Sequence, residues 1–266
     1  MRCSYASGKF DRILGVETLT PFDIALLAGL IFAAAVIYTS VGHAGASGYI
    51  AAMALFGLTP AVMRPTALTL NIIVATLATY RWNGAGLVNW KTLGPLLITS
   101  IPAAFIGGTV QLPGTWYRLL VGIVLFVAAL KLLIQPRSGA GSDRARTAMP
   151  WLAGLLAGGL VGMLSGLTGT GGGIFLSPLL LFFGWAGTRQ ASGITAPFIL
   201  VNSVAGLAGN LLSLKGLPGE LPYFVIAALL GGVVGTSVGI GMASTVMLQR
   251  ILGVVLLVAA GKFIFV

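Results

Sequence analysis

The sequence contains very little charge. Only 8% of its 266 residues are charged and 57% are hydrophobic, whereas about 25% of the residues of a soluble globular domain are charged. Repeated windows of about 20 residues carry no charge at all, which is typical of membrane-spanning helices. The apolar runs do not alternate at period two, as the strands of a membrane barrel would. The sequence therefore predicts an all-α integral membrane protein.

Side chains that support chemistry are also scarce. The chain has one cysteine, Cys3, and one histidine, His43, which excludes an intramolecular disulfide and a cysteine-based metal cluster. No acidic residue lies in the middle of an apolar run, so no carboxylate proton relay is visible. An intramembrane enzyme would need a nucleophile with its base, a metal or paired carboxylates, and only His43 with Ser40 or Ser47 could serve. We predict no enzymatic activity, no cofactor and no metal site.

Basic residues outnumber acidic ones by 15 to 5, giving a formal net charge of +10. They are spread along the chain, mostly at the ends of apolar runs, as the positive-inside bias of membrane proteins produces. This distribution argues against a nucleic-acid partner. The expected partners are membrane lipid and a small anionic substrate, with a homo-oligomer left open. The expected location is the inner (plasma) membrane, crossed several times.

The apolar runs fall into two sets of five. The first set lies at 22–41, 43–58, 66–82, 93–111 and 116–135, and the second at 151–168, 171–187, 192–213, 221–242 and 245–266. We predict a polar N-terminal tail over 1–20, a first transmembrane repeat over 21–135, a cytoplasmic linker over 136–150 and a second repeat over 151–266. Ten crossings are favoured, and eight remain open.

The two sets resemble each other. SVGHAGASGYI at 40–50 matches SGLTGTGGGIF at 165–175, and VAALK at 127–131 matches VAAGK at 258–262, at offsets between about 125 and 131 residues. Five crossings per repeat would give the halves opposite orientations. Paired glycine-interrupted segments in duplicated halves are a hallmark of secondary transporters and indicate their binding site.

The glycine-rich segments are the candidate binding site. Four glycines within 169–173 disfavour continuous helix, and the start of a following helix would bind an anion through free N–H groups and a partial positive charge. The alternative is close helix packing through small residues. The candidate substrate-binding residues are His43, Gly45, Ser47, Thr66, Thr69, Asn71, Thr168, Thr170, Gly171, Gly172, Ser192, Thr195 and Asn202. Arg64 and Arg189 could contact the anion, or could be anchors at the membrane surface.

The motif GTGGGIFLSPLLLFFGW at 169–185, followed by Gln190, Ala191, Gly193 and Thr195, resembles the second-half motif of the TauE/SafE family of sulfite and sulfonate transporters. VGHAGASGYIAAMALFGLTPAVMRPTALTLN at 41–71 is similar to its first-half counterpart. The resemblance covers nearly all of the chain after the tail and implies a permease for sulfur-containing or other organic anions. Many first halves of the family carry three consecutive glycines, whereas this chain has Ala46, Ser47 and Gly48, a departure that weakens an assignment to sulfite itself.

The direction of transport follows from electrostatics. A membrane potential that is negative inside drives anions outward, by about 2.3 kcal/mol per charge per 100 mV. We therefore predict export of a small sulfur-containing or organic anion, held at the glycine-rich helix breaks near the midplane, with His43 as the candidate for proton linkage. Cation-coupled anion uptake and an anion channel are the alternatives.

Overall fold

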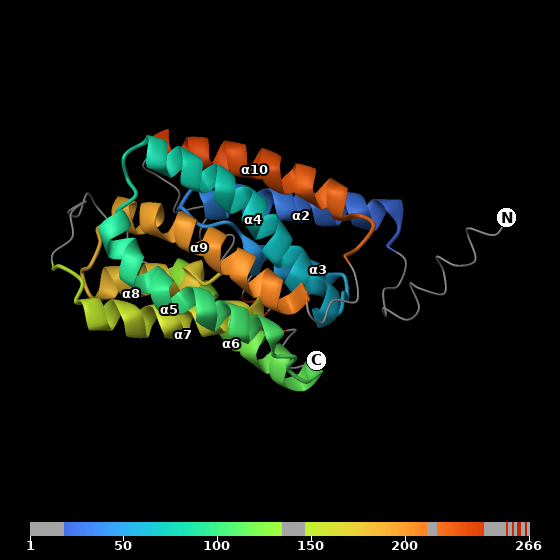
Figure 1. Cartoon of the computed structure of the whole chain (residues 1–266). Helices are drawn as coiled ribbons and strands as arrows, with labels where there is room; N and C mark the ends of the chain where they lie inside the picture. The colour runs from blue at the N-terminus through green and yellow to red at the C-terminus, as the bar shows by residue number, and fades with distance from the viewer. Residues whose placement is uncertain are drawn as a thin grey trace.

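The computed structural model describes residues 19–134, 147–211 and 217–241, together with five single positions, 254, 257, 260, 261 and 264. The described residues contain helices and no strand, which confirms the prediction of a helical fold (Figure 1). The helices are α2 (Pro21–Thr39), α3 (Ala46–Leu55), α4 (Pro60–Gly84), α5 (Trp90–Thr109), α6 (Gly114–Ile134), α7 (Trp151–Thr168), α8 (Gly173–Phe182), α9 (Thr188–Leu211) and α10 (Leu221–Gly241). Most of the predicted tail, most of the linker and most of the last apolar run lie outside the described residues.

The described helices differ in their ability to cross a membrane. Six of them, α2, α4, α5, α7, α9 and α10, are long and apolar enough to do so, which agrees with a multi-pass membrane protein. By contrast, α3 and α8 contain only 10 residues each, or about 15 Å at 1.5 Å per residue. The number of crossings stays a prediction.

Two helices begin earlier than the apolar runs indicate. The α4 helix begins at Pro60 rather than at 66, and α9 begins at Thr188 rather than at 192. Proline at a first helical position costs no hydrogen bond, because that N–H has no partner within the helix, so Pro60 extends α4 across a polar stretch. Arg64 and Arg189 consequently lie inside helices, which corrects their predicted position at the ends of runs.

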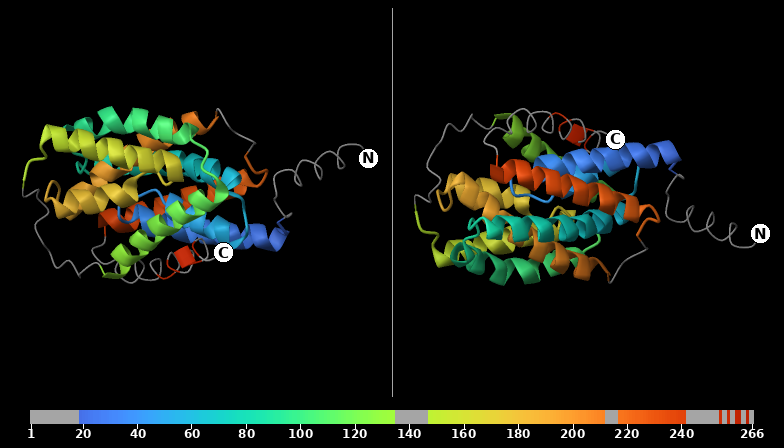
Figure 2. Two further views of the ribbon diagram at one scale, coloured as in Figure 1. Left: turned by 90° about the horizontal axis from the view of Figure 1, so that it is seen from below. Right: turned by 90° about the horizontal axis from the view of Figure 1, so that it is seen from above.

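The described parts of the two halves follow the same order of elements, and helices of one half pack against helices of the other. In Figure 1, α2 begins at one end of the bundle and α7 begins at the other. The main helix pairs join the halves: α5 packs on α7, α10 packs on α2, and α4 packs on α9. Both views in Figure 2 show the same arrangement of long helices. The inverted duplication remains a prediction with which these paired contacts agree.

Glycines at every fourth position make two of these pairs close. On α7 the residues Gly158, Gly162 and Gly166 face the backbone of α5, and an added Cβ at any of them would collide with a carbonyl oxygen, of Leu96, Ser100 or Ala104. On α10, Gly231, Gly235 and Gly239 face the carbonyls of Phe32, Val36 and Ser40 on α2 in the same way. Because lipid removes the hydrophobic driving force between helices, close packing of small residues has to stabilise such pairs.

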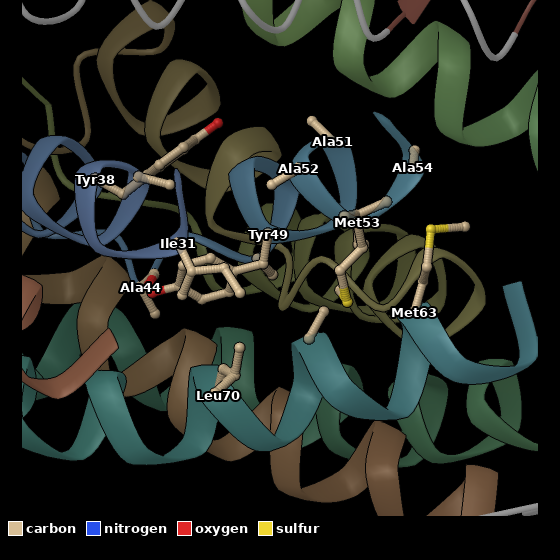
Figure 3. Packing of buried hydrophobic residues seen from close by; sticks show 14 of the residues in the cluster. Ile31, Tyr38, Ala44, Tyr49, Ala51, Ala52, Met53, Ala54, Met63 and Leu70 are labelled. Carbon is tan, nitrogen blue, oxygen red and sulfur yellow. Dashed lines mark hydrogen bonds between the residues drawn. The ribbon is translucent and has the colours of Figure 1, made fainter. Parts of the chain in front are cut away.

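The short helix α3 is held by an apolar cluster between α2 and α4. Tyr49 and Met53 of α3 are fully buried. In Figure 3, Met53 points toward α4, from which Met63 and Leu70 point back, and Tyr49 lies toward Ala44. Ile31 of α2 belongs to the same cluster. This packing fixes the position of α3 and therefore of the chain break before it.

Neighbouring glycines on α7 provide a matched test of the close packing. An alanine methyl at Gly158 would overlap the Leu96 carbonyl and lie 2.8 Å from Thr99 Oγ1, whereas one at Gly159 has its nearest atom at 3.7 Å, Thr99 Cβ. We expect G158A to destabilise the protein by about 1–3 kcal/mol, as overpacking does, and to lower the unfolding midpoint in detergent. G159A should leave the midpoint unchanged or raise it, because alanine favours helix. Equal midpoints for the two variants would contradict this packing.

Candidate functional site

Both halves contain a helix break inside the bundle. The first break lies between α2 and α3 and the second between α7 and α8. The residue before each short helix is a glycine in a left-handed conformation, Gly45 at φ 106° and Gly172 at φ 81°. Residues with a side chain rarely adopt this conformation. The prediction that glycines open a helix N-terminus at Gly173 is confirmed.

The two breaks are joined by Asn71 of α4, which is fully buried. Its Oδ1 accepts a hydrogen bond at 3.1 Å from the backbone N–H of Ala46, the first residue of α3. Its Nδ2 donates to the backbone carbonyl of Thr170 in the second break at 3.4 Å and to Ser203 Oγ of α9 at 3.3 Å. The Asn71 side chain therefore caps the start of α3 after the first break and binds the backbone of the second break.

His43 connects the breaks a second time. Its Nε2 lies 3.0 Å from the carbonyl oxygen of Gly173 and 3.1 Å from Ser177 Oγ of α8. Ser177 Oγ lies 2.9 Å from Thr195 Oγ1 of α9, which donates to the Ala191 carbonyl at 2.6 Å. Hydrogen bonds thus run continuously from the first break to the beginning of α9.

The histidine ring faces a carbonyl on both of its nitrogens. Nδ1 lies 3.0 Å from the Val41 carbonyl oxygen, and Nε2 lies at the same distance from that of Gly173. A neutral imidazole has one N–H and can donate to only one of these oxygens, whereas the imidazolium donates to both. Which of the two carbonyls a neutral ring binds therefore depends on its tautomer.

Backbone N–H groups at the start of both short helices are unused. Among the described residues, the N–H groups of Ser47 and Gly48 in α3, and of Gly173 and Ile174 in α8, have no acceptor. Such groups give the start of a helix its partial positive charge. The breaks therefore bring two positive helix ends and several N–H donors into one buried region.

Other candidate residues have partners around the breaks. Thr168 Oγ1 lies 2.8 Å from Thr170 Oγ1, within the second break. Gly171 packs against Asn71, because an added Cβ would lie 2.5 Å from Asn71 Nδ2. Ser192 lies against Gly42 of the first break, where an added Cβ would come within 2.5 Å of the serine Cβ.

Four candidates make local contacts or none. Ser47 donates to the Tyr38 hydroxyl at 2.6 Å, and Thr69 donates to the Pro65 carbonyl of its own helix. Asn202 donates within its own helix to Phe198, and its Oδ1 is buried without a partner among the described residues. The hydroxyl of Thr66 also has no partner there. The structure does not bring these four side chains to the contacts between the breaks, and their binding roles stay predictions.

Arg64 is a buried brace rather than a surface anchor. It is 5% exposed, and its guanidinium donates to the carbonyls of Gly107, Gly108 and Val110 at the end of α5 and of Gly166 in the last turn of α7. The negative ends of two helices thus stabilise its charge. The alternative of a membrane-surface anchor is wrong for Arg64, and its predicted anion contact stays untested.

Arg189 is exposed and has a single hydrogen bond among the described residues, from Nη2 to the Ile240 carbonyl near the end of α10 at 3.0 Å. It occupies the first turn of α9, as Arg64 occupies the beginning of α4. Each arginine thus binds the end of the fourth helix of its own half. Arg64 uses most of its donors there, and Arg189 uses one.

Three buried tyrosines complete the site and were not among the predicted residues. Tyr38 accepts from Ser47, and Tyr49 donates to the Ala44 carbonyl within the first break. Tyr117 of α6 donates to the Thr168 carbonyl before the second break at 3.1 Å. Hydroxyl-bearing aromatics inside apolar runs would have been the sequence signal, because a buried tyrosine hydroxyl needs a partner.

These features define a multi-pass helical membrane transporter. A model of the family described as "Sulfite exporter TauE/SafE" matches residues 27–263, and the chain belongs to this family. It is 39% identical over 240 residues to the "Probable membrane transporter protein y4hK" of Sinorhizobium fredii (strain NBRC 101917 / NGR234), an alignment that covers 90% of this chain and 97% of that relative. No solved structure matches the chain.

The different settings of the two arginines predict different effects on stability. R64Q leaves several buried carbonyls without donors, each costing about 1–3 kcal/mol, so the unfolding midpoint in detergent should fall sharply. R189Q removes one exposed hydrogen bond and should change the midpoint little. The measurement is thermal unfolding of both purified variants beside the wild type. Similar midpoints for R64Q and R189Q would show that Arg64 is not the brace described.

Proposed function

We propose that the protein is a secondary transporter that exports small sulfur-containing or organic anions of the sulfite and sulfonate class. The observation that carries the proposal is the meeting of two helix N-termini, of α3 and α8, with unused N–H donors inside the bundle. Positive helix ends at discontinuous helices hold anionic groups in secondary transporters. The family and the similar membrane transporter support the class of function.

The anion would be bound mainly by backbone groups. Ser47, Gly48, Gly173 and Ile174 would supply N–H donors, and Thr170 a hydroxyl next to them. Such donors suit oxyanions, which accept several hydrogen bonds at once. The residues around the breaks are almost entirely buried, so the site would be closed to both sides in this conformation. Binding and release then require the breaks to move apart.

His43 would adjust this closure. Its ring holds Val41 and Gly173 together, and only the protonated ring donates to both carbonyls. A proton on His43 would also add a positive charge beside the anion. The chain through Ser177 and Thr195 offers a hydrogen-bonded connection to the start of α9. His43 is the one histidine of the chain and the candidate for proton linkage, so we expect transport to depend on pH.

Export requires no coupled cation. A potential of 100 mV, negative inside, contributes about 2.3 kcal/mol per charge to anion exit, or about a 50-fold gradient. Uptake would need co-transported cations, and an anion channel would give flux that does not saturate. These two alternatives therefore differ from carrier-mediated export in measurable ways.

Flux from proteoliposomes tests direction and mechanism. Vesicles loaded with sulfoacetate or sulfite should release it without a proton or sodium gradient. The rate should saturate with internal concentration and rise when the interior is made negative with potassium and valinomycin. A requirement for an inward cation gradient would establish uptake instead, and a linear dependence on concentration would establish a channel.

Substitution of His43 tests its role in pH dependence. We expect wild-type flux to change when the pH is varied between about 5.5 and 7.5, through protonation of His43. H43Q keeps a hydrogen-bonding side chain of similar length but cannot titrate, so its flux should be flat over this range. T76A, which removes an exposed hydroxyl bonded within its own helix, is the control and should keep the wild-type profile. An unchanged pH profile in H43Q would exclude His43 as the linked group.

A further inference from the structure

A second polar region lies away from the breaks, at one end of the bundle. It is a cavity of about 650 Å³ lined by Gly86, Leu87, Val88, Asn89, Trp90, Lys91, Arg189 and Gln190. These residues belong to the connection from α4 to α5 and to the first turn of α9. In Figure 1 this is the left end of the molecule, where α4 ends and α9 begins.

The lining of the cavity is positively charged. Lys91 and Arg189 both line it, and none of the described residues that line it is acidic. Arg189 makes one hydrogen bond among the described residues, so its guanidinium keeps donors for a ligand. The corresponding arginine of the first half, Arg64, donates instead to four carbonyls. The guanidinium of the first half is therefore bound by protein carbonyls, whereas that of the second half is left with most of its donors unused among the described residues.

Two helix N-termini add to this positive potential. The α5 helix begins at Trp90, next to Lys91, and α9 begins at Thr188, next to Arg189. Both ends belong to helices of 20 residues or more, so each carries a partial positive charge of about half a unit. Two cations and two helix ends at one cavity favour an anion there.

The packing beneath the cavity fixes its shape. Gly193 of α9 lies so close to Leu87 that an added Cβ would come within 2.6 Å of the Leu87 carbonyl carbon. Trp82, which is 2% exposed, packs with Leu87 and Val88 beneath the lining. Its indole N–H is buried and has no partner among the described residues. The cavity thus combines an apolar floor with a cationic rim.

We infer that this cavity binds the transported oxyanion before it reaches the helix breaks. The site would take a small sulfonate or related oxyanion, with the charged group between Lys91 and Arg189 and a short carbon chain on the apolar floor. This inference rests on the proposed function. The connections that hold Arg81 and Lys91, and Arg189, carry basic and no acidic residues, which by the positive-inside bias predicts the cytoplasmic side, where an exported anion is collected.

The test uses sulfoacetate as the probe and the full chain. Its Kd is measured by calorimetry in neutral detergent, and efflux is measured from vesicles of phosphatidylcholine alone. K91Q and K91Q/R189Q should raise the KM for efflux at least fivefold while Vmax stays within twofold of the wild type. The weaker binding of the double variant should also depend less on salt than that of the wild type. T76A, on α4 and outside the cavity, removes an exposed hydroxyl that is bonded within its own helix; it is the control and should match the wild type.

Several outcomes would overturn the inference. An unchanged KM in both variants would do so, as would a fall in Vmax without a change in KM. A fivefold effect that appears only when anionic phospholipid is added would assign the cavity to a lipid headgroup. The single variant K91Q is included because it keeps the hydrogen bond of Arg189 to α10, so its effect on KM does not come from loss of that bond. If the wild type moves no anion at all, the proposed function fails instead, which separates the two claims.

Discussion

The breaks in two helices impose the constraint on which the rest of this structure depends. Inside a membrane, a backbone that leaves the helix has to find other partners for its N–H and carbonyl groups. Here Asn71 supplies them to both breaks, and His43 binds the second break from the first. The N–H groups that remain unused at the starts of α3 and α8 are then available to an anion. The side chains that stabilise the breaks therefore lie beside the N–H groups proposed to bind the anion.

Both helix breaks lie against helices of the other half, so a movement between the halves would move the breaks. Because α5 packs on α7 and α10 on α2, each break is next to helices of the other half. Arg64 ties α4 to the ends of α5 and α7 at one end of the bundle, whereas Arg189 makes one exposed contact at the other end. The two ends of the bundle thus differ in how many hydrogen bonds these equivalent arginines make.

Local signals predicted the helical class, the glycine breaks and the start of α8 at Gly173, because glycine and apolar runs act over a few residues. The partners of Arg64 could not be predicted. They are backbone carbonyls more than forty residues away. Every residue has a backbone carbonyl, so the residue type does not reveal which one is a partner. The link through Asn71 was hidden for the same reason. The beginning of α4 was missed because a polar stretch that starts with proline resembles a loop, although Pro60 suits a first helical turn.

The central claim is that an oxyanion binds between the starts of α3 and α8, and its position can be measured directly. Selenite has the shape and charge of sulfite, and selenium scatters anomalously. In crystals grown with selenite, the account predicts an anomalous peak within hydrogen-bonding distance of the N–H groups of Gly173 and Ile174 or of Ser47 and Gly48. Peaks confined to the cavity at Lys91 and Arg189, or to the protein surface, would contradict it.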